Sequence, residues 1–150
     1  MSSTKELGGN LKSAIGSKGT VGAIEFCNTE ALVITKKLSD THHVELKRVS
    51  DKNRNPSNKA NEEELQIINE FKNSLGSGNS ELQPVVKVSD EKMIGYYPIL
   101  TNGLCLQCHG GVGEEITEDV SAKLKELFPK DSAVGYAAGE LRGLWVVKEK

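Results

Sequence analysis

The spacing of apolar side chains predicts helices in three parts of the chain. The first helical pattern covers residues 5–38. Its apolar face recurs every three or four residues, at Ile24, Cys27, Ala31 and Ile34. Three glycines around position 19 weaken the middle of this pattern, so one helix and two helices broken near Gly19 fit it equally well.

The other two helices have clear ends. The helix over residues 61–75 begins at Asn61, and Glu64 follows at the spacing of a capping box. The helix over residues 117–128 carries two acidic residues in its first turn and stops at Pro129, which cannot continue a helix.

Between the helices, β-branched and apolar residues predict extended segments. Five strands are expected, over residues 44–49, 82–88, 93–100, 134–138 and 144–148. The second and third are joined by a short polar turn over residues 89–92, so they form a hairpin. Helices beside an antiparallel sheet make an α+β fold.

Length and charge narrow the class of protein. The chain has 150 residues, which suits a single domain over residues 1–150, with residues 1–4 read as a linker remnant in front of it. The net charge is −2, so neither nucleic acid nor an anionic membrane is an expected partner. No apolar run reaches the roughly 18 residues of a membrane-spanning helix. No catalytic set stands out either, so we do not expect an enzyme.

One motif carries specific chemistry. Residues 105–109 read Cys105-Leu106-Gln107-Cys108-His109, the attachment pattern of haem c. Two thiols at this spacing form thioether bonds to one porphyrin, and His109 then becomes the proximal iron ligand. A dithiol redox pair or half a zinc site would use the same two cysteines, but no second ligand pair for zinc follows. We therefore expect one covalent haem c, held on a loop before the third helix.

Haem c implies a location. Covalent haem attachment normally takes place outside the cytoplasm, so we expect a periplasmic protein. The first residues do not form a secretory signal, and the precursor would have to supply one.

The third cysteine is a candidate for the second axial ligand. Cys27 remains once the haem has taken Cys105 and Cys108, and a lone thiol in an oxidising compartment needs shielding or a bond. It would equally serve as a small buried apolar residue. Other candidates, besides an open coordination site, are Met93, His42, His43, Lys36 and Lys37.

Haem propionates need hydrogen-bond donors. The guanidinium groups of Arg48 and Arg54 match carboxylates in shape and charge. Tyr96 and Tyr97, directly before the motif in the last strand of the hairpin, are expected to supplement them.

Several segments together resemble a known family. They are residues 23–28 (AIEFCN), 48–50 (RVS), 54–58 (RNPSN), 96–99 (YYPI), 105–110 (CLQCHG) and 139–145 (GELRGLW). In this order they resemble the PAS-like haem c domains, long described as a domain of unknown function, of soluble cytochromes and sensor ectodomains. The pattern departs from the family after the RNP segment, where residues 61–64 lack the usual aromatic residue.

The resemblance implies a PAS-like α+β fold with haem c at its sheet. It also implies an axial pair of His109 and a Cys27 thiolate, and an anionic sulfur ligand lowers the reduction potential of the iron. Two functions follow as expectations. One is a low-potential electron carrier that docks on a redox partner protein. The alternative is a periplasmic sensor module in which redox state, CO or NO changes the bond to Cys27.

Overall fold

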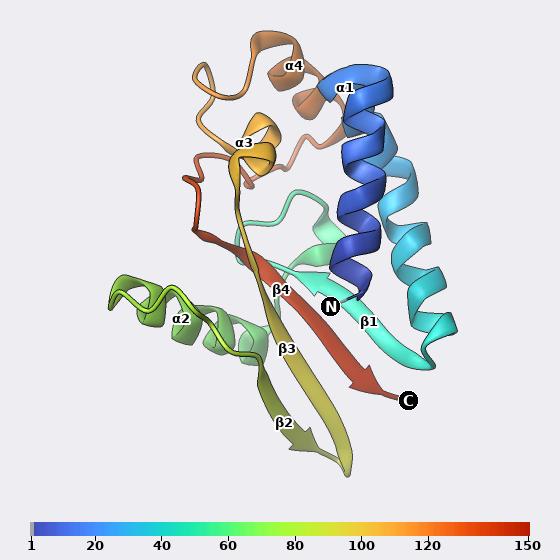
Figure 1. Ribbon diagram of the computed structural model, residues 1–150, viewed down its shortest axis with the longest axis vertical. Coiled ribbons are helices and arrows are strands. Elements are labelled where there is room, and N and C mark those ends of the chain that lie inside the picture. Colours follow the sequence, from blue (N-terminus) through green and yellow to red (C-terminus); the bar gives the residue numbers. More distant parts are fainter. Residues whose placement is uncertain (1) are drawn as a thin grey trace.

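The computed structural model describes the backbone of residues 2–150 and the side chains from Lys5 onward, and it has the predicted α+β architecture (Figure 1). The helices are α1 (Ser2–Thr41), α2 (Glu62–Gly76), α3 (Gly103–His109) and α4 (Glu118–Leu127), with a single 3-10 turn η1 (Pro56–Asn58). The strands are β1 (Val44–Val49), β2 (Val85–Ser89), β3 (Lys92–Leu100) and β4 (Leu141–Glu149). None of the helices in residues 2–150 combines the length and apolar character that crossing a bilayer requires.

Helix α1 is divided at Gly19. This glycine has φ 70° and ψ 177°, a left-handed conformation that side chains other than glycine rarely adopt. The chain reverses direction there, so residues 2–18 and residues 20–41 form two arms of a helical hairpin (Figure 1). Of the two alternatives, the break near Gly19 is thus confirmed. Residues 2–4 belong to the first arm, while Met1 lies outside the described residues.

The four strands form one antiparallel sheet in the order β1-β4-β3-β2. Strand β4, the last in the sequence, therefore lies between β1 and β3. In the register of the sheet Arg48 pairs with Trp145, and Trp145 pairs with Tyr97. Since directly opposed residues point to the same face, these three side chains form one row across the sheet.

Helix α2 covers the opposite face. The predicted capping box is confirmed: the Asn61 side chain accepts from the Glu64 amide, and the Glu64 carboxylate accepts from the Asn61 amide, both at 2.9 Å. The core between α2 and the sheet contains Val49, Ala60, Ile67, Ile68, Phe71, Ile94, Tyr96, Leu141, Leu144 and Val146.

A smaller core joins α1 to α4 at the other end of the molecule. Its buried members are Ile24, Ile116, Val120, Leu124 and Phe128, and the side chains of Val21 and Cys108 pack against them. This core brings the second arm of α1 against α3, which carries Cys105 and Cys108. The predicted helical face is correct too, because Ile24 and Ala31 are buried and Cys27 lies between them.

Two sequence predictions about strands need correction. Residues 134–138 do not form a strand of the sheet, because their backbone bonds to the end of α3 instead: the amides of Gly135 and Tyr136 donate to the carbonyls of Gly110 and His109. Strand β2 begins only at Val85, since the preceding Pro84 has no amide hydrogen for a ladder bond.

Candidate functional site

The cysteine motif lies on a short helix rather than on the expected loop. Helix α3 begins where the Asn102 side chain accepts from the amides of Leu104 and Cys105, at 3.0 and 3.3 Å. Cys105 and Cys108 are three residues apart, so they lie on the same side of this helix. His109 is its last residue. The motif therefore presents two thiols and an imidazole from one turn and a half of helix.

The protonation of His109 is fixed by its neighbour. Its Nδ1 lies 2.7 Å from the carbonyl oxygen of Ala133. Because a carbonyl only accepts, Nδ1 carries the hydrogen, and the lone pair is on Nε2. Burial, with the charges of Arg54 and Arg142 nearby, holds the pKa of His109 well below its ordinary value. The ring is thus neutral, with Nε2 in the form that binds metals.

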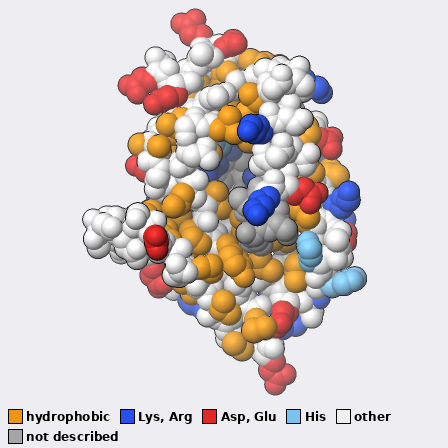
Figure 2. All heavy atoms as spheres, viewed as in Figure 1, with side chains coloured by type: hydrophobic (Ala, Val, Ile, Leu, Met, Phe, Trp, Pro, Cys, Tyr) orange, Lys and Arg blue, Asp and Glu red, His pale blue; other side chains and the backbone are white. Residues whose placement is uncertain are grey.

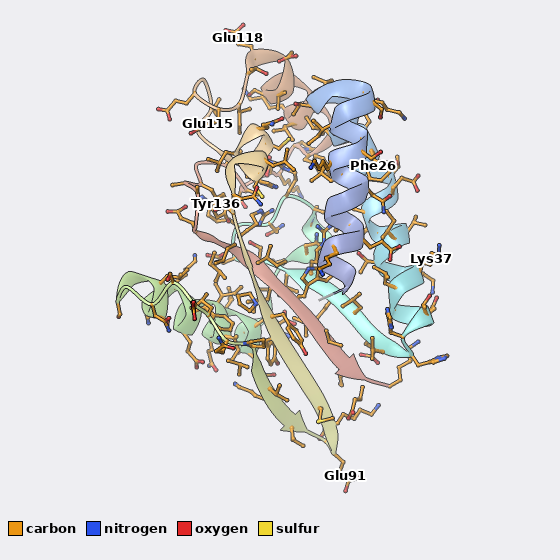
Figure 3. All side chains as sticks on the ribbon, viewed as in Figure 1. Phe26, Lys37, Glu91, Glu115, Glu118 and Tyr136 are labelled. Carbon is orange, nitrogen blue, oxygen red and sulfur yellow. The ribbon has the colours of Figure 1, made fainter. Side chains whose placement is uncertain are left out.

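The segment after α4 holds the end of the motif from below (Figure 3). The Gly135 amide donates to Gly110 at 2.7 Å, and the Tyr136 amide donates to His109 at 2.9 Å. The Tyr136 ring stands edge-on to the imidazole, with the centroids 6.3 Å apart and the planes at 87°. These contacts fix both the backbone and the ring of His109.

The guanidinium of Arg54 ties the same parts together. Its Nε donates to the Asp131 carboxylate at 2.9 Å. Its Nη2 donates to the carbonyls of Cys108 and Ala133, the latter at 3.2 Å. The side chains of Arg54 and Asp131 are only 12% and 10% exposed. Nε and Nη2 thus bond within the chain, and Nη1 is the nitrogen that remains for a propionate.

The predicted ligand Cys27 lies on the second arm of α1. Burial raises its pKa, while the charges of Arg48 and Arg54 lower it. Burial also raises the pKa of Cys108 to about 11, again opposed by Arg54, and the charge of Cys27 adds to the rise. The two thiols therefore lie within range of each other's charge and share Arg54 as a neighbour.

A hydrogen bond and a core hold this arm against the motif. The Thr20 hydroxyl donates to the side-chain oxygen of Gln107 at 2.9 Å. Gln107 lies between the two cysteines of the motif, so the start of the second arm is fixed to α3. Ile24, one turn before Cys27, is 3% exposed in the core that Cys108 also contacts.

Several cations gather around these residues. The guanidinium of Arg48 lies over the Trp145 ring at 5.4 Å. The Tyr136 ring has the Lys52 ammonium at 4.4 Å and the Arg142 guanidinium at 5.5 Å. The Lys52 ammonium also donates to the carbonyl of Val134 at 2.6 Å.

These cations outnumber the carboxylates beside them. Asp131 pairs with Arg54, whereas Arg48, Lys52 and Arg142 have no carboxylate partner among the described residues. Burial lowers the pKa of Arg48 and of Arg142, because burying a charge without a partner is costly. Figure 2 shows a hollow in the upper half of the molecule with Lys and Arg side chains at its rim and in its depth. Such a region suits an anionic group.

Sequence reasoning missed part of this cluster. Arg142 was not among the residues predicted for the site, yet its Nη1 donates to Ser50 Oγ and to the Lys52 carbonyl, at 2.9 and 3.0 Å. Its Nε and the hydroxyl of Tyr136 are buried without a hydrogen-bond partner. The sequence did offer one signal for Arg142, because it lies in residues 139–145, one of the segments that resemble the family. Tyr136 and Lys52 gave none.

The two tyrosines proposed for the cofactor lie on opposite faces of the sheet. Tyr97 lies in the row with Trp145 and Arg48, on the face away from α2. Tyr96 is 2% exposed in the core under α2, where burial and then Glu63 raise its pKa to about 12. The structure therefore brings Tyr97, but not Tyr96, to the face on which Arg48 lies.

The alternative axial ligands lie far from the motif. Met93 is seven residues before the end of β3, about 23 Å at the rise of a strand. His42 and His43 directly precede β1. The first residue of β1, Val44, pairs with Glu149, at the same end of the sheet as Met93. Lys36 is exposed and pairs with Asp40. Within residues 2–150, no three or more His, Cys, Asp or Glu side chains gather into a group that would hold a metal ion alone.

Comparison with known proteins identifies the family. The family model described as Tll0287-like matches residues 2–149. Among solved structures, the crystal structure of the cyanobacterial heme-protein Tll0287 matches with 26% identity and a TM-score of 0.63. The match covers 75% of this chain and 65% of that one, so the chain spans about two thirds of its relative's length. No curated protein matches. These findings confirm the PAS-like family that the sequence resembles, and the chain belongs to the Tll0287-like family.

Proposed function

We propose that this protein is a monohaem c-type cytochrome that carries electrons at low potential. The observation that carries the proposal is the arrangement of His109. Its imidazole is neutral, its Nδ1 donates to Ala133, and its Nε2 is left free directly after two cysteines at the haem c spacing. The membership of the heme-protein Tll0287 in the same family supports haem as the group bound.

The remaining residues fit this group as well. Cys105 and Cys108 would form the thioethers, and His109 would be one axial ligand. Haem propionates are anions, and the unpaired cations Arg48 and Arg142 with the partnerless Tyr136 hydroxyl supply donors for them. When bound, haem c supplies one-electron redox chemistry, and the chain holds it, orients it and limits its contact with water.

We propose Cys27 as the second axial ligand. Its arm is held to α3 by Thr20 and Gln107, and Arg48 and Arg54 favour its thiolate form. Burial opposes that form, so the bond to sulfur depends on the positive charge of the ferric iron. An anionic sulfur ligand stabilises ferric iron and lowers the potential. This axial pair accounts for the low potential in the proposal.

The first experiment asks whether the protein carries covalent haem. The protein is produced with a periplasmic signal and a haem c maturation system, and its absorbance is recorded oxidised and reduced. We expect a coloured protein whose pigment stays with the polypeptide in acidified organic solvent. The Cys105→Ala, Cys108→Ala double variant should lose the pigment. A colourless wild-type protein would refute the proposed function.

The second experiment tests Cys27. Cys27→Ala should raise the reduction potential and change the ferric EPR and charge-transfer spectra, because an anionic sulfur ligand is lost. Met93→Leu is the matched control: it removes a thioether sulfur that is 51% exposed at the far end of β3, and it should change neither property. Identical ferric spectra for Cys27→Ala and the wild type would remove Cys27 from the iron.

The alternative function is a redox or diatomic-gas sensor. One observation favours it: α1 carries Cys27 and contacts β1, α3 and α4, so a change at the sulfur would reach three other elements. In a sensor, reduction or CO binding should alter hydrogen exchange along residues 20–41. For an electron carrier we expect fast electron transfer to a redox partner protein. Hydrogen exchange along residues 20–41 should then be the same in the oxidised and reduced protein. We propose a periplasmic location in both cases, since haem c is attached there.

A further inference from the structure

The carbonyl oxygen of Ala133 accepts two hydrogen bonds of different origin. One comes from His109 Nδ1 at 2.7 Å, and the other from Arg54 Nη2 at 3.2 Å. Ala133 is fully buried, so water does not compete for this oxygen. A second, charged donor draws electron density from the carbonyl. The bond from His109 to Ala133 is therefore weaker than it would be without Arg54.

Asp131 closes this arrangement into a ring. One of its carboxylate oxygens accepts from Arg54 Nε at 2.9 Å, and the other accepts from the Ala133 amide at 2.8 Å. Arg54 also donates to the carbonyl of Cys108, next to His109 in the motif. The ring thus fixes the position of the shared carbonyl relative to the motif, and Asp131 partly neutralises the charge of Arg54.

We infer that Arg54 and Asp131 are a positioning pair that sets how strongly His109 donates electrons through Nε2. This inference rests on the proposed function, since it needs a metal at Nε2. A stronger bond from Nδ1 makes the imidazole a stronger donor, which favours ferric iron. Arg54 weakens that bond and adds a positive charge, and both effects favour the ferrous state. Asp131 acts in the opposite sense, because it offsets the charge of Arg54.

Two substitutions with opposite expected signs test the pair in the haem-loaded protein. Arg54→Gln should raise the ferric-to-ferrous ratio at a fixed solution potential at least tenfold, about 59 mV for a one-electron couple. Asp131→Asn keeps the shape of the side chain, but it replaces one of the two accepting oxygens with an NH2 donor and leaves the charge of Arg54 unneutralised, so the ratio should fall. Arg54→Lys retains the charge, and its ratio should lie nearer the wild type than that of Arg54→Gln. The exposed Lys130, next to Asp131, provides the control Lys130→Gln, which should match the wild type.

A second readout follows the hydrogen bond itself. The Nδ1 proton of His109 is observed by NMR in the reduced protein with CO bound, because that state is low-spin and diamagnetic whether or not Cys27 stays on the iron. The proton signal should move downfield in Arg54→Gln, since the bond to Ala133 strengthens, and stay in place in Lys130→Gln. Potentials that shift in the same direction for Arg54→Gln and Asp131→Asn would overturn the inference, as would an unmoved Nδ1 proton. A colourless wild-type protein would instead be a failure of the proposed function, so the two are distinguishable.

Discussion

Replacing Gly143 with alanine should loosen the junction of β1 and β4. A Cβ at this position would lie 2.3 Å from the carbonyl oxygen of Val49 and 3.2 Å from Ser50 Cβ. Contacts of a Cβ under 3.0 Å are essentially never observed, so the two strands would have to separate by at least 0.7 Å. The obstacle is backbone, which cannot rotate away as a flexible side chain can.

Three hydrogen bonds cross this junction and would be lost if the strands separated. Ser50 Oγ donates to the Arg142 carbonyl at 2.8 Å, and Arg142 Nη1 donates to Ser50 Oγ and to the Lys52 carbonyl at 2.9 and 3.0 Å. At about 1 kcal/mol each, their loss lowers the free energy of unfolding by about 3 kcal/mol. For a domain of this size that corresponds to a fall in Tm of about 6–12 °C.

Thermal unfolding followed by far-UV circular dichroism measures this fall. Gly16→Ala is the matched control, because Gly16 lies in the first arm of α1 with no heavy atom within 4 Å of the added Cβ. In that helix alanine is preferred by up to about 1 kcal/mol, so the control should equal or exceed the wild type in Tm. A Gly143→Ala protein that melts within about 2 °C of the wild type would show that the steric reasoning is wrong.

Two further predictions concern the α2 side of the sheet. Asn61→Ala removes the cap of α2 and should cost about 1 kcal/mol in urea unfolding, with an unchanged m-value; an unaltered midpoint would mean that the capping box contributes nothing. Tyr96 has its pKa raised to about 12, so its neutral form is favoured in the folded protein. The stability that it contributes is complete below about pH 10, its ordinary pKa, and is lost as the pH rises towards 12. Tyr96→Phe should therefore flatten the alkaline part of a Tm-against-pH curve, and a curve parallel to that of the wild type would contradict this assignment.

The elements that the sequence predicted well are those fixed by neighbours in the chain. The capping box at Asn61 and the apolar repeat after it define α2 without reference to the rest of the molecule. The turn of Asp90 and Glu91, both at positive φ, defines the hairpin of β2 and β3 in the same way. The strand predicted over residues 134–138 was wrong, because the apolar pattern of a segment does not show which backbone groups it bonds to, and these residues bond to the end of α3.

The candidate site also contains one part that the sequence shows and one part that only the fold shows. Cys105, Cys108 and His109 are adjacent, so their joint chemistry is visible in the sequence. The surroundings of His109 are not, because Ala133 follows it by 24 residues and Arg54 precedes Cys108 by 54. Only the fold brings a carbonyl and a guanidinium from such distances to one imidazole.

This separation bears on how the protein matures. Thioether formation requires only five contiguous residues, so pigment attachment needs no tertiary structure. The acceptor for the imidazole is in place only when residues 133–136 dock against α3. Under the proposed function, maturation therefore has two stages. Haem is first attached covalently to a polypeptide that is still unfolded, and His109 reaches its final hydrogen bonding when residues 133–136 pack against α3.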